Sequence, residues 1–191
     1  RGIIFDRNGL KLAESIQVSS VYADPLLIKE KKETAKVISD VLNLNKTKVV
    51  NLLNKQKRFV WLKRRIADEQ ADALRQLNLK GIGFRYEYKR IYPYEKLCSH
   101  VLGFTDVDEN GLEGIEGSLN QVIAGSKGSR VVEKDGRQRQ FSTLKEETVS
   151  ARYGNSVYLT IDCEIQSIVE DELENACLKW KPDSAIAIAM N

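Results

Sequence analysis

The alternation of apolar and polar positions predicts that the chain opens with a β-hairpin. An apolar run at residues 3–5 is followed by Asn8-Gly9 and then by an extended run over residues 10–22. Asn-Gly favours a tight turn because both positions tolerate positive φ angles. Further strands are expected at residues 59–62, 84–90, 157–159 and 185–190.

Helical spacing of apolar residues predicts most of the remaining elements. Helices are expected at residues 35–42, 47–53, 68–77, 94–102, 112–123 and 163–180. Asp162 is a suitable N-cap for the last of these helices, and Pro182 is expected to end it. A further hairpin is expected over residues 129–145, around Gly136. This mixed order of strands and helices indicates an α+β fold.

Composition excludes several classes of protein. With 42% apolar and 30% charged residues, the chain can bury a core and is not an obvious disordered segment. Three cysteines without a CxxC pair and a single histidine, His100, exclude a zinc finger or a His-based metal site. No apolar run approaches the roughly 20 residues that a membrane-spanning helix needs.

Charge is distributed unevenly along the chain. The formal net charge is only +3, with 30 Lys and Arg against 27 Asp and Glu. Residues 1–92 hold 20 of the basic and 10 of the acidic side chains, whereas residues 93–191 hold 10 and 17. A segment of charge +10 beside one of charge −7 can mark a surface for a charged partner.

Ser142-Thr-Leu-Lys145 has the SxxK pattern with which penicillin-recognising enzymes place a nucleophilic Ser one helical turn from an activating Lys. The flanking residues are too polar to bury a neutral amine, and no KTG triad follows. Ser118-Leu-Asn120 imitates the SxN partner motif but precedes the SxxK pattern. We therefore interpret the pattern as a coincidence, with acyl-serine chemistry as the alternative.

The acidic segment Asp106-Val-Asp108-Glu-Asn110-Gly111 matches the first half of an EF-hand calcium loop. The bidentate Glu that completes such a loop should stand at position 117, which is Gly, and Glu116 is one position short. We therefore expect an Asx-rich turn that leads into a helix. Asp108, Glu113 and Glu116 are also candidates for acid–base chemistry, but acids at a solvated helix start explain them better.

A basic run with aromatic residues extends over residues 55–65. Nucleic-acid-binding surfaces combine cations for phosphate with rings for base stacking, so binding of nucleic acid or another anionic polymer is one interpretation. Strand alternation would put Phe59 and Trp61 on one face and Arg58, Val60 and Leu62 on the other. An amphipathic strand with solvated Lys and Arg is the interpretation that we favour.

Four motifs, in a fixed order, resemble those of class B penicillin-binding proteins. Residues 1–13, RGIIFDRNGLKLA, resemble the RGxIxDRxGxxLA signature that follows the membrane anchor in that family. Arg90-Ile-Tyr92-Pro93, with HVLGF at residues 100–104, is similar to its RxYP…HxLGF segment. GLEGIE at residues 111–116 resembles GxEGxE, and residues 159–166 resemble LTIDxxxQ. Glu95 departs from the family pattern, in which a small residue is common at that place.

The resemblance implies a fold and a division of the chain. The N-terminal module of the family is an elongated, multi-lobed α+β pedestal of hairpins and helices. Residues 1–28 and 81–160 would form its conserved core, and residues 29–80 an inserted α/β head lobe. Residues 161–191 would begin the transpeptidase domain, whose three catalytic motifs are absent from this chain.

The resemblance also implies a function. The chain would be the non-catalytic pedestal of a single-pass, extracytoplasmic D,D-transpeptidase that cross-links peptidoglycan, and residues 23–25 and 61–64 resemble division-type members. Implied partners are a SEDS-type glycosyltransferase, other division or elongation proteins, the transpeptidase domain itself and a second copy of the chain. The resemblance implies no cofactor, and binding of nucleic acid stays the alternative.

The motif residues are expected to have structural or interaction roles. The glycines and Asn8 would form turns, and the charged motif residues would pair in a polar network. The charged candidates for this network are Arg1, Asp6, Arg7, Arg90, Glu113 and Glu116. The other expected motif residues are Gly2, Gly9, Tyr92, Pro93, Gly103, Gly111, Gly114, Asp162 and Gln166. The basic half would be a lobe that meets a membrane surface or an acidic partner.

Overall fold

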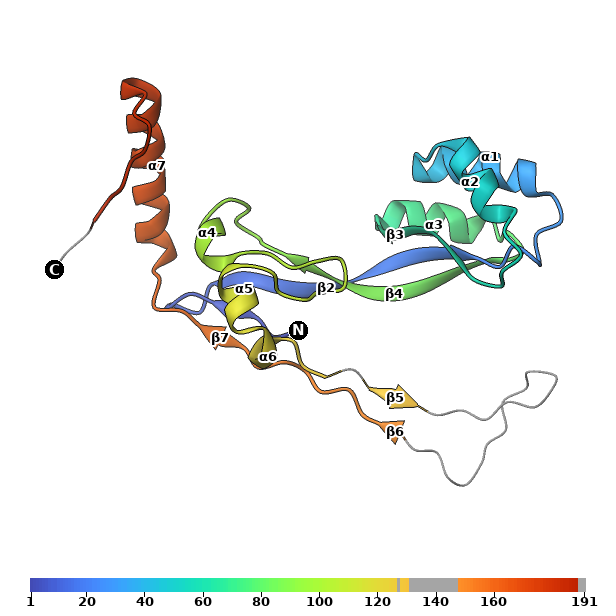
Figure 1. Ribbon diagram of the computed structural model, residues 1–191, viewed down its shortest axis with the longest axis horizontal. Coiled ribbons are helices and arrows are strands. Elements are labelled where there is room, and N and C mark those ends of the chain that lie inside the picture. The colour runs from blue at the N-terminus through green and yellow to red at the C-terminus, as the bar shows by residue number, and fades with distance from the viewer. Residues whose placement is uncertain (127, 131–147, 189–191) are drawn as a thin grey trace. The chain divides into compact units, whose positions relative to one another are not determined.

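The computed structural model describes residues 1–126, 128–130 and 148–188 and has the α+β architecture expected from the sequence (Figure 1). The chain forms two compact units, each with its own hydrophobic core. Unit 1 consists of Arg1–Ser15 together with Arg90–Asn191, and unit 2 consists of Ile16–Lys89. Strands β2 (Lys11–Ala23) and β4 (Ile82–Ile91) each contribute residues to both units.

The predicted N-terminal hairpin is confirmed in unit 1. β1 (Ile4–Phe5) pairs antiparallel with the start of β2 and parallel with β7 (Val157–Tyr158). Gly9 has a φ angle of 86° in the connecting turn, a left-handed conformation that glycine adopts without strain. The sheet contributes three fully buried side chains to the core of unit 1, namely Ile4, Leu12 and Ala13.

The helix expected at residues 94–102 is confined to α4 (Ser99–Leu102). Glu95 and Cys98 have left-handed φ angles of 46° and 57°, and such residues interrupt a right-handed helix. The segment before α4 instead forms consecutive turns, in which the Glu95 amide donates to the Tyr92 carbonyl at 3.0 Å. Glu95 thus has the conformation for which a glycine would be better suited.

The single helix expected at residues 112–123 is wrong, because two short helices lie there. They are α5 (Gly114–Ser118) and α6 (Asn120–Ile123), separated at Leu119, whose φ and ψ angles are −102° and 19°. The first helix also begins late, because Glu113 is extended, with φ and ψ angles of −134° and 170°. Gly125, with a φ angle of 71°, follows α6 as expected.

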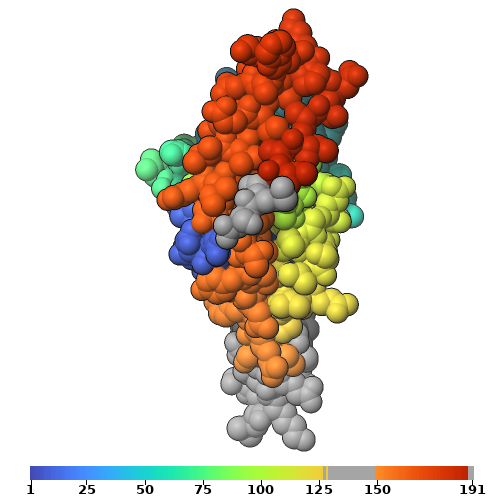
Figure 2. Space-filling view, turned by 90° about the vertical axis from the view of Figure 1, so that its left-hand side faces the viewer, coloured from blue at the N-terminus to red at the C-terminus, as the bar shows by residue number. Residues whose placement is uncertain are grey.

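The C-terminal helix is confirmed as α7 (Cys163–Trp180). The Asp162 carboxylate accepts hydrogen bonds from the backbone amides of Glu164 and Ile165, which is the predicted cap. The helix ends at Lys181, whose φ angle is 48°, immediately before Pro182. Much of the surface of α7 lies open, as the orange and red part of Figure 2 shows.

The last predicted extended segments of unit 1 are only partly present. β5 (Ser129–Arg130) and β6 (Thr148–Val149) pair antiparallel, and the residues between them lie outside the described part of the chain. Residues 185–188 form no strand, which corrects the expectation for 185–190, and residues 189 and 190 are not described. A strand needs a hydrogen-bonded neighbour, and residues 185–188 have none among the described residues.

Unit 2 packs three helices on a three-stranded sheet, and each of these elements lies where the sequence predicts a helix or a strand. β2 lies in the centre and pairs with β3 (Val60–Ile66) and with β4. The helices are α1 (Lys31–Leu42), α2 (Lys46–Leu53) and α3 (Asp68–Gln76), and their apolar faces bury residues such as Ile38, Val49 and Leu74. No helix in the described ranges of either unit has both the length and the apolar character needed to cross a membrane.

Candidate functional site

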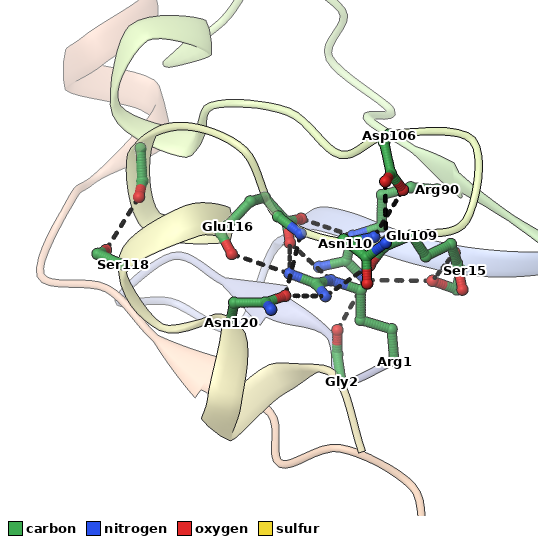
Figure 3. Close-up of polar contacts among 12 residues, drawn as sticks. Arg1, Gly2, Ser15, Arg90, Asp106, Glu109, Asn110, Glu116, Ser118 and Asn120 are labelled. Carbon is green, nitrogen blue, oxygen red and sulfur yellow. Dashed lines mark hydrogen bonds and ion pairs between the residues drawn. The ribbon is translucent and has the colours of Figure 1, made fainter. Parts of the chain in front are cut away.

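Three charged side chains of unit 1 form a buried ion-pair cluster from distant parts of the sequence. Arg1 precedes β1, Arg90 lies near the end of β4, and Glu116 lies on α5 (Figure 3). These side chains are at most 1% exposed. Arg90 donates from Nε to Oε1 of Glu116 at 2.6 Å, and Arg1 donates from Nε to Oε2 at 2.8 Å. We call Arg1, Arg90 and Glu116 the buried node.

Backbone carbonyls and one amide side chain accept further hydrogen bonds from the node. Arg1 donates from Nη1 to the Glu109 carbonyl at 2.8 Å and to Oδ1 of Asn120 at 2.7 Å. Its Nη2 donates to the carbonyl of Glu116 itself at 2.9 Å. Arg90 donates from Nη1 to the Gly2 carbonyl at 2.7 Å. The node therefore ties together the backbone of three separate segments.

Burial makes the node most sensitive to the loss of Glu116. Two cations share this one anion, so carbonyl dipoles supply part of the compensating negative potential. Removing Glu116 would leave two buried cations without a counter-charge, and breaking a buried ion pair in this way typically costs about 3–5 kcal/mol. Both oxygens of Glu116 accept guanidinium N–H groups, which leaves the carboxylate poorly suited to act as a general base. The arrangement is suited to holding segments in place.

Tyr92 lies beside the node, and its environment keeps the phenol protonated. Burial raises the pKa of Tyr92, and the negative charge of Glu116 raises it further. The positive charges of Arg90 and Arg1 act in the opposite direction without reversing the net rise. The tyrosine of the RxYP segment is therefore a neutral side chain at ordinary pH.

Asp6 connects the first hairpin to the start of α7. Its Oδ1 accepts from the amides of Asn8 and Leu10 at 2.8 and 2.7 Å, and its Oδ2 accepts from the amide of Cys163 at 3.3 Å. Burial alone would raise the pKa of Asp6, but these backbone N–H groups outweigh it and lower the pKa. Asn8 also donates from Nδ2 to Asp162 at 3.2 Å. These bonds hold the N-terminus of α7 against the hairpin.

Two of the three cysteines are buried in the core of unit 1. Cys98 and Cys163 are 2% and 3% exposed. Burial raises the pKa of Cys163 to about 12, and the nearby charge of Asp6 contributes. The pKa of Cys98 is also raised, first by burial and then by Glu170, which accepts a hydrogen bond from the Cys98 amide at 3.1 Å. Both side chains are therefore neutral thiols and unreactive at ordinary pH.

The acidic segment at residues 106–111 forms an Asx turn. Oδ1 of Asp106 accepts from the amides of Asp108 and Asn110, both at 2.8 Å, and Oδ2 accepts from Nδ2 of Asn110 at 2.9 Å. The Asp106 carboxylate is thus committed to its own loop. Among the described residues, no group of three His, Cys, Asp or Glu side chains could hold a metal ion.

Three charged residues expected in the polar network lie outside the buried node. Asp6 accepts from backbone amides instead, and the side chains of Arg7 and Glu113 are exposed and have no hydrogen bond or ion pair within the described residues. Gln166 instead bonds along α7, donating from Nε2 to Glu170 at 2.8 Å. The motif glycines lie at close backbone approaches. A Cβ at Gly103, for example, would overlap the Glu113 carbonyl. Gly2, Gly111 and Gly114 are similarly confined.

Sequence reasoning missed three residues that surround the node, namely Asn120, Ser15 and Glu109. Asn120 accepts from Arg1 and also from the Gly111 amide at 3.0 Å. The Ser15 hydroxyl donates to Oε1 of Glu109 at 2.7 Å and accepts from Arg90 at 3.4 Å. Asn120 stands four positions after Glu116, but the break at Leu119 separates the two, so helical spacing does not mark it. Nothing in the local sequence marks Ser15, because its partners lie far along the chain.

The basic run at residues 55–65 forms part of unit 2. Val60 and Leu62 are buried, whereas Phe59 and Trp61 contact each other with ring centroids 4.9 Å apart, as the alternation predicts. Arg64 pairs with Glu87 at 2.5 Å, and this bond lowers the pKa of Glu87 against the effect of burial. Ser142 and Lys145, the two residues of the SxxK pattern, lie outside the described residues.

Comparison with known sequences identifies relatives along the whole chain. The model of the penicillin-binding protein dimerisation domain matches residues 1–159. Stage V sporulation protein D of Bacillus subtilis is 34% identical over 194 residues, and the peptidoglycan D,D-transpeptidase FtsI of Escherichia coli K12 is 31% identical over 198 residues. Both alignments cover 100% of this chain but only 30% and 33% of the relatives. The chain thus spans about a third of their length.

Solved structures show the same fold. Penicillin-binding protein PBP2 of Helicobacter pylori, solved in complex with MreC, is 26% identical, with a TM-score of 0.73 over 92% of this chain and 37% of that chain. Penicillin-binding protein 2X of Streptococcus thermophilus is 23% identical, with a TM-score of 0.62 over 93% of this chain and 30% of that chain. The α+β fold expected from the resemblance is therefore confirmed.

Proposed function

This chain belongs to the penicillin-binding protein dimerisation domain family, and from that premise we propose that it is the non-catalytic pedestal of a larger D,D-transpeptidase that cross-links peptidoglycan. The named activity of FtsI, to which the whole chain aligns, supports this substrate class. In this proposal the parent protein is anchored by a single membrane span and faces the periplasm or the outer side of the cytoplasmic membrane.

The buried node is the observation that carries the proposal. It uses one charged residue from each of three family motifs, RG, RxYP and GxEGxE, and both oxygens of its one carboxylate pair with the two guanidinium groups. The groups of an active site must be free to exchange protons, whereas these charged motif residues are paired with one another. They therefore stabilise the fold, as expected in a supporting domain. The acidic Asx turn is likewise occupied by its own backbone.

The proposed role also assigns each part of the chain to a region of the parent protein. We assign residues 1–28 and 81–160 to the core of the pedestal and residues 161–191 to the beginning of the transpeptidase domain. Residues 29–80 are assigned to an inserted head lobe, which packs with the flanking residues 16–28 and 81–89 in unit 2. The open apolar side chains of α7, among them Ile168 and Trp180 at 63% and 74% exposure, suit a helix that packs against that domain.

Docking of partners is the second part of the proposal. The Helicobacter pylori relative was solved in complex with MreC, which supports a pedestal that binds another cell-wall protein. We extend this to proteins of the division or elongation machinery, including a SEDS-type glycosyltransferase, and to a second copy of the chain.

A deletion in the full-length protein tests the pedestal role. Cells depleted of the parent protein receive either the intact form or a form in which the membrane anchor is joined directly to residue 160. We expect the shortened form to bind a fluorescent penicillin, which reports a folded catalytic domain, but to restore neither growth nor peptidoglycan cross-linking. Full restoration by the shortened form would show that no pedestal is needed.

A further inference from the structure

Unit 2 has one sheet face that its helices leave open (Figure 1). α1, α2 and α3 pack on the face that carries Val21, Ala23 and Leu62, all of which are buried. Tyr22 and Ala23 pair in regular register with Trp61 and Val60, and because side chains alternate along such a strand, Tyr22 lies on the face opposite to Ala23. Its register partner on β3 is Trp61, so the two aromatic side chains lie side by side on the open face.

Three aromatic rings form a continuous cluster on this face. Tyr22 and Phe59 stack with centroids 4.8 Å apart at an interplanar angle of 28°, and Phe59 meets Trp61 edge to face at 83°. Phe59 remains 38% exposed. Rings that pack on one another are held in place before any partner arrives, so they offer a preorganised apolar surface.

The neighbouring strand leaves room for this cluster. Gly83 lies on β4, and a Cβ at this position would overlap the ring of Tyr22. The Tyr22 ring therefore lies directly against the backbone of β4. A side chain at position 83 would displace Tyr22 and break its stack with Phe59. The arrangement of the rings therefore depends on glycine at this position.

Two arginines hold their guanidinium groups over the rings. The guanidinium carbon of Arg85 lies 5.1 Å from the centroid of Phe59 and 6.0 Å from that of Tyr22, and that of Arg64 lies 5.7 Å from Trp61. Arg64 is also paired with Glu87. Arg85 is exposed and pairs with no carboxylate among the described residues. We call Tyr22, Phe59, Trp61, Arg64 and Arg85 the aromatic–arginine face.

Unit 2, which carries this face, has an excess of basic residues. Residues 16–89 contain 16 Lys and Arg against 8 Asp and Glu, a balance of +8. The run at residues 55–65, which supplies Phe59, Trp61 and Arg64, has six basic residues and no acidic one. Such a field attracts an anionic partner and opposes a basic one.

The geometry of the rings distinguishes between anionic partners. A nucleic acid would need free ring faces on which its bases can stack. Here Tyr22 and Phe59 stack on each other and Arg85 lies over both, so the ring faces are largely occupied. A guanidinium held over a ring still presents N–H donors, which match a carboxylate in a bidentate manner. Carboxylates flanked by apolar side chains fit this surface better than bases do.

We propose that the aromatic–arginine face is the docking surface for an acidic polypeptide segment of a partner protein. Asp or Glu side chains of the segment pair with Arg85, and its apolar side chains pack against Phe59 and Trp61. This inference rests on the docking role proposed above and names the chemistry of the partner.

Titration of the 15N-labelled 191-residue chain with a synthetic peptide tests the proposal. The probe is a peptide in which Asp and Glu alternate with Leu and Gly, and the matched control peptide has Asn and Gln in their places. We expect the acidic peptide to shift the indole N–H signal of Trp61 and to leave that of Trp180 on α7 unchanged. The control peptide should shift neither signal.

Variants at one position separate the face from general charge attraction. Arg85→Gln should weaken binding of the acidic peptide about tenfold, as expected for one lost charge-assisted hydrogen-bonded pair. Arg85→Lys keeps the charge but loses the planar fork, so it should bind with intermediate affinity. Lys36→Gln, on α1, removes the same charge from the other layer of unit 2 and should bind as the unmodified chain does.

Several results would overturn the proposal. They are an unchanged affinity in Arg85→Gln, an equal loss in Lys36→Gln, and equal binding of the control peptide. Tighter binding of oligothymidylate or of phosphatidylglycerol vesicles, lost in Arg85→Gln, would assign the face to nucleic acid or to a lipid surface instead. A failed titration together with a successful deletion experiment would remove this surface and leave the pedestal role standing.

Discussion

Glu116 shows how a single residue can organise a protein interior. Its carboxylate is fully buried, yet both oxygens are matched by guanidinium groups from segments that lie far away in the sequence. The charged residue of the same motif at position 113 is exposed and makes no such contact. Two glutamates of one motif therefore have opposite physical roles, and only their surroundings distinguish them.

Substitution of the two glutamates tests this difference. Glu116→Gln keeps the size of the side chain but leaves Arg1 and Arg90 buried without a counter-charge, so we expect the free energy of unfolding to fall by about 3–5 kcal/mol. Glu113→Gln should change it by less than about 0.5 kcal/mol. Urea unfolding followed by circular dichroism measures both variants. Similar effects of the two substitutions would contradict the buried node.

The raised pKa of Cys163 predicts that the free energy of unfolding falls at alkaline pH. Its pKa is raised from 9.0 to about 12 by burial and by the charge of Asp6, so the folded chain holds this proton more tightly than the unfolded chain does. The stabilising effect is complete below pH 9 and is lost as the pH rises toward 12. We expect Cys163→Ala to reduce the loss of stability between these pH values, measured by urea unfolding.

The matched control for this prediction is Cys177→Ala. Cys177 lies half-buried on α7, outside the core that contains Cys163. This variant should keep the pH dependence of the unmodified chain. If Cys163→Ala and the unmodified chain lose stability in parallel above pH 9, the buried thiol does not contribute to this loss.

At the scale of elements, the sequence predicts the helices, turns and caps that are determined by local interactions. The hairpin at Asn8-Gly9, the helices of unit 2 and the cap at Asp162 all depend on turn chemistry and on the spacing of apolar residues. Each of these signals lies within a few residues of the element that it defines, so each could be recognised without the rest of the chain.

The helices around the node could not be predicted in the same way. Residues 112–123 have apolar positions at helical spacing, but the backbone leaves the helical conformation at Glu113, which is extended, and at Leu119, whose φ and ψ angles are −102° and 19°. The first break lies at a close approach to another segment, because a Cβ at Gly114 would overlap the Val101 carbonyl. Tertiary contacts thus override the helical pattern and leave two short helices.

Substitution of two glycines tests how closely the backbone of unit 1 is packed. Gly9 and Gly103 both have left-handed φ angles, 86° and 70°, but a Cβ at Gly9 meets open space whereas one at Gly103 overlaps the Glu113 carbonyl. Gly9→Ala should cost about 1–2 kcal/mol for the conformation alone. Gly103→Ala should cost about 1–3 kcal/mol more because of overpacking. Thermal unfolding that ranks the two variants equally would contradict this close packing.

At the scale of the whole molecule, family motifs and physical pairing give complementary information. The order of the motifs indicates the family and its fold, and the comparisons confirm both. The motifs do not indicate which charged residues meet. Arg1, Arg90 and Glu116 come together, Arg7 and Glu113 do not, and Ser15 joins without any motif to mark it. Only the folded backbone decides these partners, because they are up to 115 positions apart.

The central proposal is that this chain supports a catalytic domain and performs no acyl transfer itself. The most direct measurement is peptide mapping by mass spectrometry after the full-length protein has reacted with a labelled penicillin. We predict that every adduct maps outside residues 1–191 and that the 191-residue chain alone acquires none. An adduct on Ser142, or on any other residue of the chain, would contradict the account.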